Sequence, residues 1–88
     1  MKFVKISAIW CGACLIMNKV WNKLKENTTF EFIELDYDMD EEEAMKYSPG
    51  KILPVFIFYN DNEEVFRMVG EFSYEDIINK LKEVGVLA

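Results

Sequence analysis

The sequence predicts an α/β fold in which one mixed, four-stranded sheet carries helices on both faces. Short apolar segments alternate with helical patterns in the order β-α-β-α-β-β-α along 88 residues, and we expect residues 1–88 to form a single domain. A β-α-β beginning makes the first two strands parallel, with a right-handed crossover. The last two strands are close enough in sequence to form an antiparallel hairpin at one edge of the sheet.

The first strand and the first helix are predicted at the start of the chain. The segment Lys2 to Ile9 is short and rich in apolar and β-branched residues, which is typical of a strand. The chain then turns into a helix, and Asn27 is expected to end that helix in the left-handed conformation. The apolar residues that recur at helical spacing are Cys14, Met17, Trp21 and Leu24.

The middle of the chain predicts a second strand and a short helix. Phe30 to Asp36 has the composition of a strand. The acids from Asp40 to Glu43 favour the first turn of a helix, where the helix dipole is positive. This helix must stop by Ser48, because Pro49-Gly50 cannot continue it.

The last part of the chain predicts a hairpin and a final helix. Leu53 to Tyr59 is apolar at nearly every position, as expected for a strand covered on both faces. Asn60 to Glu63 is a turn sequence, and Val65 to Gly70 is the fourth strand. Ser73, with Asp76 three residues later, resembles a capping box. The inward-facing residues of the last helix are Ile77, Ile78, Leu81 and Val84.

Composition and charge exclude several classes of function. Sixteen acids against ten bases give a net charge of −6, and without a basic run nucleic acid is a poor partner. The absence of histidine excludes Ser-His-Asp catalysis and every metal site that needs histidine. The longest uncharged apolar run, Ile52 to Tyr59, is eight residues, far short of the ~20 that cross a bilayer. Met1 to Lys5 does not resemble a secretory signal, so we expect a cytoplasmic protein.

The strongest chemical signal is Trp10-Cys11-Gly12-Ala13-Cys14, at the junction of the first strand and the first helix. Free N–H groups and the helix dipole favour a thiolate at Cys11. We expect Cys11 to be exposed and Cys14, one turn inside the helix, to be shielded but able to close a disulfide with it. Gly12 and Ala13 are small enough to let a partner chain approach, and Trp10 offers an amphipathic platform.

Two other interpretations of the cysteine pair stay open at this point. The pair could supply half of a zinc site, but zinc needs four ligands and only carboxylates or a second chain could complete the set. The pair could instead be inert buried thiols, which the position at a helix start and the neighbouring glycine disfavour.

The motif and the order of elements resemble the thioredoxin family over essentially the whole chain, in a short form similar to glutaredoxin-like proteins. The resemblance implies a minimal thioredoxin-like fold. It also implies a cis-proline that faces the cysteines, at Leu53-Pro54, and a glycine near the substrate groove, at Gly70. With Trp10, Gly12 and Ala13, these residues are the expected contacts with substrate.

The function that the resemblance implies is thiol–disulfide exchange on protein disulfides. Cys11 would attack the substrate disulfide, and Cys14 would then release the reduced substrate. No prosthetic group or metal is implied, only a redox-active Cys11–Cys14 disulfide and a separate reductase similar to thioredoxin reductase. A glutathione-dependent enzyme and a redox sensor without turnover remain alternatives, and we expect a monomer.

One position departs from the family. Thioredoxins usually bury an acid six residues before the first cysteine, paired with a lysine of the neighbouring strand; the residue here is Lys5. Counting along the second strand places Glu34 opposite it, with Asp36 as the alternative partner. The sequence therefore predicts the same pair with its charges exchanged, placed to tune the cysteines. The other interpretation is that Lys5 simply extends its charged end into solvent.

Overall fold

The computed structural model describes residues 1–87 and contains the elements in the predicted order. Their ends differ from the sequence-based boundaries by at most two residues for the strands. The elements are β1 (Lys2–Ser7), α1 (Gly12–Asn27), β2 (Glu31–Asp36), α2 (Glu41–Met45), β3 (Val55–Asn60), β4 (Glu63–Val69) and α3 (Tyr74–Glu83).

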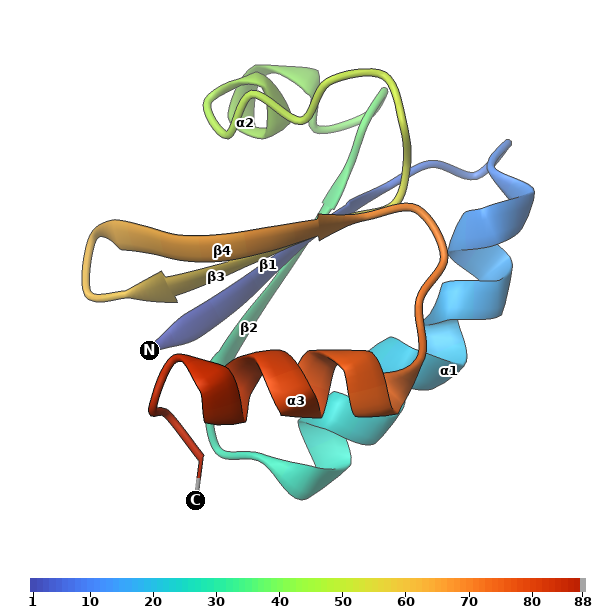
Figure 1. Cartoon of the computed structure of the whole chain (residues 1–88). Helices are drawn as coiled ribbons and strands as arrows, with labels where there is room; N and C mark the ends of the chain where they lie inside the picture. The colour runs from blue at the N-terminus through green and yellow to red at the C-terminus, as the bar shows by residue number, and fades with distance from the viewer. Residues whose placement is uncertain (88) are drawn as a thin grey trace.

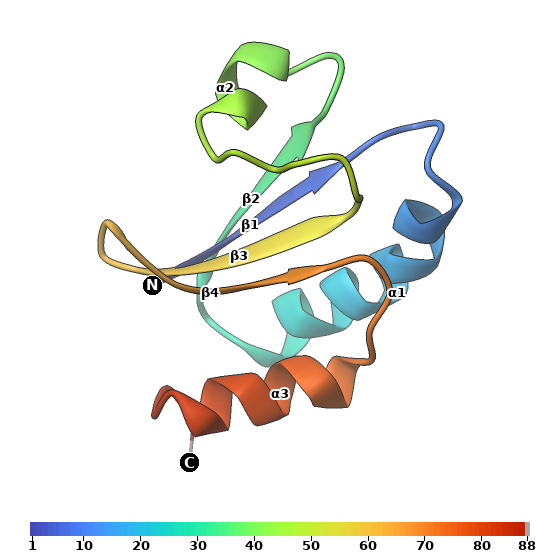
Figure 2. The same ribbon diagram turned by 45° about the horizontal axis from the view of Figure 1, so that its top comes forward.

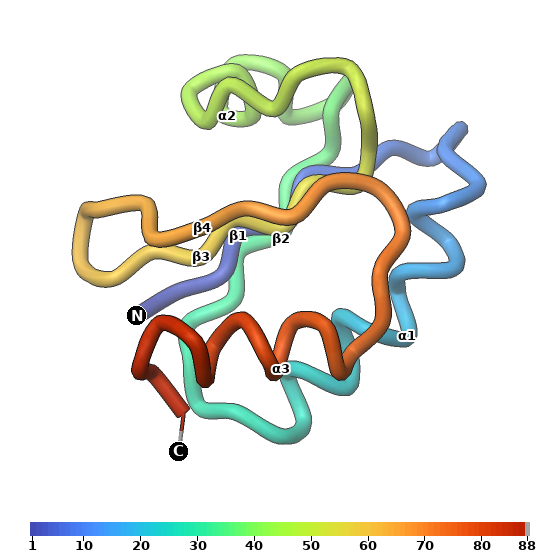
Figure 3. The backbone as a smooth tube through the Cα atoms, viewed as in Figure 1, coloured from blue at the N-terminus to red at the C-terminus, as the bar shows by residue number. Residues whose placement is uncertain are grey.

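The four strands form one mixed sheet in the order β2-β1-β3-β4. The pair β1 and β2 is parallel, whereas β3 is antiparallel to both β1 and β4. The helices α1 and α3 cover one face of the sheet and α2 covers the other (Figures 1 and 2). The predicted fold class is therefore confirmed, and β1 runs through the middle of the sheet (Figure 3).

The core between the sheet and the helices α1 and α3 is rich in aromatic rings. The Phe3 ring of β1 lies at its centre, 4.9 Å from the ring of Phe58 and 6.4 Å from that of Trp21. Because side chains alternate along a strand, Phe3, Lys5 and Ser7 share this face of β1. A lysine therefore enters the same layer as the aromatic core. The buried members of this core are Phe3, Met17, Trp21, Leu24, Phe56, Phe58, Phe66, Ile77 and Leu81.

The opposite face of the sheet packs against a smaller aliphatic cluster. Ala44 is the buried residue that α2 contributes to it. Both cysteines belong to this cluster, which places them at the end of the sheet where the two cores meet. The cluster consists of Val4, Ile6, Ala8, Cys11, Cys14, Ala44, Leu53, Val55 and Ile57.

The helix ends confirm one capping prediction and correct another. Ser73 and Asp76 form the predicted capping box at the start of α3. The left-handed conformation expected at Asn27 is wrong, since Asn27 is the last residue of α1 and Thr28 is extended, with φ −136°. Side chains satisfy the last carbonyls instead: Asn27 Nδ2 donates to the Lys23 carbonyl and Thr28 Oγ1 to the Leu24 carbonyl, both at 2.8 Å.

Arg67 of β4 ties the loop after α2 to the sheet. Its guanidinium donates to both carboxylate oxygens of Glu64, at 2.8 and 2.6 Å. It also donates to the carbonyls of Tyr47 and Ser48, at 3.0 Å each. The loop so anchored leads directly to Leu53. Among residues 1–87, no helix combines the length and apolar character needed to span a bilayer.

Candidate active site

Cys11 is the N-cap residue of α1. Its backbone is extended, and its N–H donates to the Ala8 carbonyl at 3.2 Å, so the chain turns sharply as it leaves β1. The Cys11 Sγ accepts a hydrogen bond from the backbone N–H of Cys14 at 3.2 Å. One free N–H group of the first helical turn thus points at this sulfur, which lies at the positive end of the helix dipole, an arrangement that favours negative charge on it.

The expectation that Cys11 is exposed is wrong. Its exposed fraction is 8%, close to the 5% of Cys14, and both cysteines are free. The cover comes from the loop before β3, because the Cys11 thiol donates to the Leu53 carbonyl at 3.6 Å. The resemblance implies that Pro54 faces the cysteines, but nothing in the sequence indicates how closely this loop covers Cys11 Sγ.

Cys14 is shielded, as expected, and its protonated form is favoured. The pKa of its thiol is raised to about 11, chiefly because burial disfavours the thiolate and secondly through its hydrogen bond with the Cys11 side chain. The backbone of Ala8 and the positive charge of Lys5 act in the opposite direction and lower that pKa. The two sulfurs therefore have different environments. Cys11 Sγ accepts a hydrogen bond from a helix N–H, whereas the Cys14 thiol stays protonated at neutral pH.

The Leu53–Pro54 peptide bond is cis, as the resemblance implies. Gly70 lies beside it, because its N–H donates to the Pro54 carbonyl at 2.9 Å. Gly70 has φ +82°, a backbone conformation that is strained for any residue with a side chain. The structure therefore brings Leu53, Pro54 and Gly70 together, with the Leu53 carbonyl in contact with Cys11.

The remaining motif residues lie on the outer side of the cysteine turn. Trp10 is 65% exposed, and its Nε1 donates to Asp38 Oδ2 at 2.6 Å. Its ring meets the ring of Tyr37 edge-on. Gly12 is exposed, with no atom within 4 Å of the place where a Cβ would stand, so this side of the turn is open to another molecule. Ala13, next to it, is half-buried.

Asp38 was missed by the sequence reasoning, although it lies in the acidic run after β2. Asp36 accepts hydrogen bonds from the backbone N–H groups of Asp38 and Met39, at 2.9 Å each. This tight turn directs Asp38 back towards Trp10. The sequence feature that could have indicated this contact is the acidic residues directly after β2, because β2 runs parallel to β1, which leads into the cysteine turn.

Lys5 and Glu34 form an ion pair at the base of the site. They are partners in the register of β1 with β2, and Lys5 Nζ lies 3.1 Å from Glu34 Oε1. Asp36 is opposite Ser7 and is not the partner. The Lys5 side chain is only 6% exposed, so the interpretation in which it extends into solvent is wrong. Glu34 is 51% exposed and also lies 3.8 Å from Lys25 Nζ.

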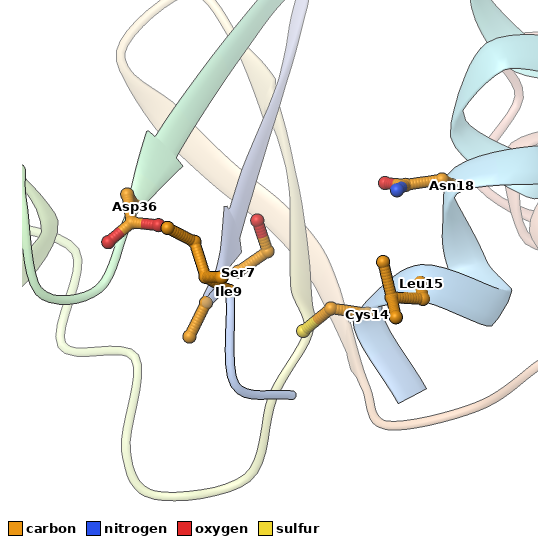
Figure 4. A pocket seen from close by; sticks show the side chains of 7 residues that line it. Ser7, Ile9, Cys14, Leu15, Asn18 and Asp36 are labelled. Carbon is orange, nitrogen blue, oxygen red and sulfur yellow. The ribbon is translucent and has the colours of Figure 1, made fainter. Parts of the chain in front are cut away.

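Two further residues hold Lys5, and neither was predicted. Lys5 Nζ donates to Asn18 Oδ1 at 3.1 Å and lies 5.2 Å from the centre of the Trp21 ring. Asn18 also borders a cleft of about 250 Å³ beside Cys14 (Figure 4). The other lining residues are Ser7, Ala8, Ile9, Leu15 and Asp36.

Metal coordination has no geometric support in the part of the chain that the structure describes. Within residues 1–87, no three cysteine or carboxylate side chains are grouped closely enough to hold an ion. The interpretation of the cysteine pair as half of a zinc site therefore gains nothing from this chain's own residues.

The sequence of this chain is similar to those of known proteins. The family model described as thioredoxin matches residues 1–83. The chain is 33% identical over 70 residues to thioredoxin Asp f 29 of Aspergillus fumigatus, a match that spans 76% of this chain and 63% of that protein. The chain thus covers less than two thirds of the length of the curated relatives that it matches first.

Solved structures agree in fold and in sequence. The reduced thioredoxin pre-protein of Schistosoma mansoni superimposes with a TM-score of 0.80 at 30% identity, covering 93% of this chain and 76% of that one. Fasciola hepatica thioredoxin superimposes with a TM-score of 0.77 at 35% identity, covering 93% and 78%. With its Trp10-Cys11-x-x-Cys14 motif at the start of α1, the chain belongs to the thioredoxin family.

Proposed function

We propose that the protein is a thiol–disulfide oxidoreductase that reduces or exchanges disulfides of other proteins. The observation that carries this proposal is the position of Cys11 at the start of α1, with its Sγ 3.2 Å from the Cys14 N–H. An attacking sulfur and a resolving sulfur within one helical turn can form and then release a mixed disulfide.

The proposed reaction has two exchange steps. The Cys11 thiolate attacks one sulfur of the substrate disulfide, so that a Cys11–substrate disulfide forms and the other substrate sulfur leaves as a thiolate. Cys14 then gives its proton to water and attacks Cys11 Sγ, which releases the second substrate thiolate. The substrate gains two electrons and the chain holds a Cys11–Cys14 disulfide. A separate reductase, similar to thioredoxin reductase, returns two electrons.

The proposed substrate surface surrounds Cys11. Trp10, Gly12 and Ala13 border it on one side, and Leu53, Pro54 and Gly70 on the other. The Leu53 carbonyl accepts a hydrogen bond from the Cys11 thiol at 3.6 Å, so this backbone lies next to the first sulfur. A substrate chain could therefore pair with the backbone in strand-like fashion while the substrate's sulfur contacts Cys11. Exposed apolar side chains at Trp10 and Ile52 support contact with another protein.

Lys5 and Glu34 are proposed to tune the cysteines. The buried ammonium of Lys5 is a positive charge on the α1 face of the sheet, and it acts to lower the pKa of Cys14 against the larger, raising effect of burial. Glu34 is half exposed and forms an ion pair with that ammonium, so it can accept the Cys14 proton through a water molecule and pass it to solvent. The cytoplasmic location and the monomeric state expected from the sequence remain predictions.

Insulin reduction tests this function. The first arm uses dithiothreitol as the electron donor, because dithiothreitol needs no matched reductase. The second arm uses NADPH with thioredoxin reductase, and the third uses glutathione with glutathione reductase. We expect acceleration in the first two arms and none in the third, with Cys11→Ser inactive in all. Turnover only with glutathione would favour a glutaredoxin-like enzyme, and no turnover in any arm would favour a redox sensor.

A further inference from the structure

A polar cluster beside Cys14 is not explained by the exchange chemistry alone. Three groups surround the ammonium of Lys5: Asn18 Oδ1 and Glu34 Oε1, each at 3.1 Å, and the face of the Trp21 ring at 5.2 Å. An ammonium has three N–H donors, so these contacts fix its position rather than merely neutralising it. The charge is held in place inside the α1 face of the sheet.

Asn18 is the member of this cluster that lies on the Cys14 side. It follows Cys14 by four residues on α1, so the two side chains project from the same face of the helix. Both line the cleft of about 250 Å³ at the end of β1, with Ser7 and Ile9 opposite them (Figure 4). Asn18 thus connects the buried ammonium with the space next to the second sulfur.

Several charged or titratable groups surround Asn18 and this space. Asp36 of β2 lines the cleft, Glu34 of β2 pairs with the Lys5 ammonium, Lys25 of α1 approaches Glu34, and Cys11 lies beside Cys14. Glu34 competes with Asn18 for the Lys5 ammonium, and Glu34 is the more strongly attracting partner because it carries a charge. Without Asn18, the ammonium would follow Glu34 towards β2 and solvent, away from α1.

We infer that Asn18 is a positioning residue for the second exchange step: it holds the Lys5 ammonium towards α1, where its charge stabilises the Cys14 thiolate that attacks the mixed disulfide. This inference rests on the proposed function. It assigns the lysine to the resolving sulfur rather than to the attacking one, which already receives the Cys14 N–H at the start of α1. The expected defect is therefore confined to release of the mixed disulfide.

The test separates the two steps with an aromatic disulfide, dithiobis-nitrobenzoic acid. With reduced protein in excess, attack by Cys11 releases one coloured thiolate, and attack by Cys14 on the mixed disulfide releases the second. Stopped-flow absorbance then records two phases. The variants are Asn18→Leu, Asn18→Ala and Asn18→Gln. Asn22→Leu is the matched control, because Asn22 is an exposed asparagine one turn later on the same helix.

We expect Asn18→Leu and Asn18→Ala to slow the second phase by roughly three- to tenfold at neutral pH and to leave the first phase unchanged. The pH profile of the second phase should move to higher pH, and Asn18→Gln should restore part of the rate because it keeps an acceptor for Lys5. Both leucine and alanine favour helix more than asparagine does, so folding is preserved.

Three other outcomes would decide the inference or the proposed function. Equal second phases in Asn18→Leu and Asn22→Leu would overturn the inference, as would a slowing of both phases together, which would indicate a general structural effect. A wild-type protein that shows no first phase would overturn the proposed function and the inference with it. A wild-type protein that shows both phases supports the function whatever the asparagine variants do.

Discussion

Lys5 lies directly opposite Glu34 in the parallel pairing of β1 with β2, and their charged atoms are 3.1 Å apart. The two side chains differ sharply in their access to water, with 6% of Lys5 exposed and 51% of Glu34. Replacing Lys5 with an apolar residue removes a buried charge and leaves Glu34, which water can reach. Neutralising Glu34 leaves the buried ammonium of Lys5 without its charged partner. The two halves of one ion pair should therefore respond differently to neutralisation.

Glu34→Gln should lower the free energy of unfolding by about 1–2 kcal/mol. This is less than the ~3–5 kcal/mol for breaking a fully buried pair, because Glu34 is half hydrated and Asn18 still accepts from Lys5. Lys5→Met should change stability by less than about 1 kcal/mol, since an apolar side chain suits the site beside Trp21. Urea unfolding of both variants checks this, and a larger loss in Lys5→Met would contradict it.

Cys14→Ser should trap a mixed disulfide through Cys11. Cys11 can still attack, but no second sulfur remains to release the substrate. Mass spectrometry of the variant after incubation with insulin should find one insulin chain attached at Cys11, and Cys11→Ser should form no adduct. A stable adduct at Cys14 in Cys11→Ser would reverse the two assignments.

The reduced protein should lose stability at high pH through Cys14. Its pKa is about 11 in the folded chain, against an ordinary thiol value of 9.0. Because the folded pKa is raised, the stabilising contribution is complete below about pH 9 and is lost as the pH rises to about 11, a loss of roughly 2–3 kcal/mol.

The control for this pH effect is the reduced Cys14→Ser variant, which cannot titrate at that position. Denaturant unfolding from neutral to alkaline pH should show a steeper decline for the wild type. Parallel declines in the two proteins would mean that other groups, such as Tyr59 with its raised pKa, account for the whole effect.

Arg67→Met should loosen the loop that covers Cys11. The substitution removes two hydrogen bonds to the carbonyls of Tyr47 and Ser48 and the paired contact with Glu64. Unfolding should become easier by about 1–2 kcal/mol, and hydrogen exchange should increase over residues 46–53. Arg67→Lys is the matched control, because lysine keeps the charge but cannot donate in a fork to three groups. Unchanged exchange in Arg67→Met would contradict the anchoring role.

Features that depend on local spacing could be predicted from the sequence. The capping box at Ser73 and Asp76 is a contact between residues three apart, and it forms as expected. The pairing of Lys5 with Glu34 follows from the register of two parallel strands, which the hydrophobic pattern fixes because a one-residue slip would expose the core face. The cysteine turn follows from its position between a strand and a helix.

Features that depend on how the layers meet could not be predicted. Asn18 reaches Lys5 because α1 crosses β1 at one particular rotation, and an exposed polar residue on a helix gives no sign of this contact. The anchoring of residues 47 and 48 by Arg67 joins parts of the chain about twenty positions apart. The cover over Cys11 depends on the path of the loop before β3, which chain length alone does not determine.

The central position of β1 has a consequence for attachment of the molecule. β1 starts at Lys2 and runs towards the cysteine turn, so the N-terminus lies at the opposite end of the sheet. The last turn of α3 lies on that side as well (Figures 1 and 2). An affinity tag, a tether to a surface or a fused domain can thus be joined at either end of the chain without covering Cys11. Immobilised by either terminus, the molecule would present the cysteine turn on the side away from the support.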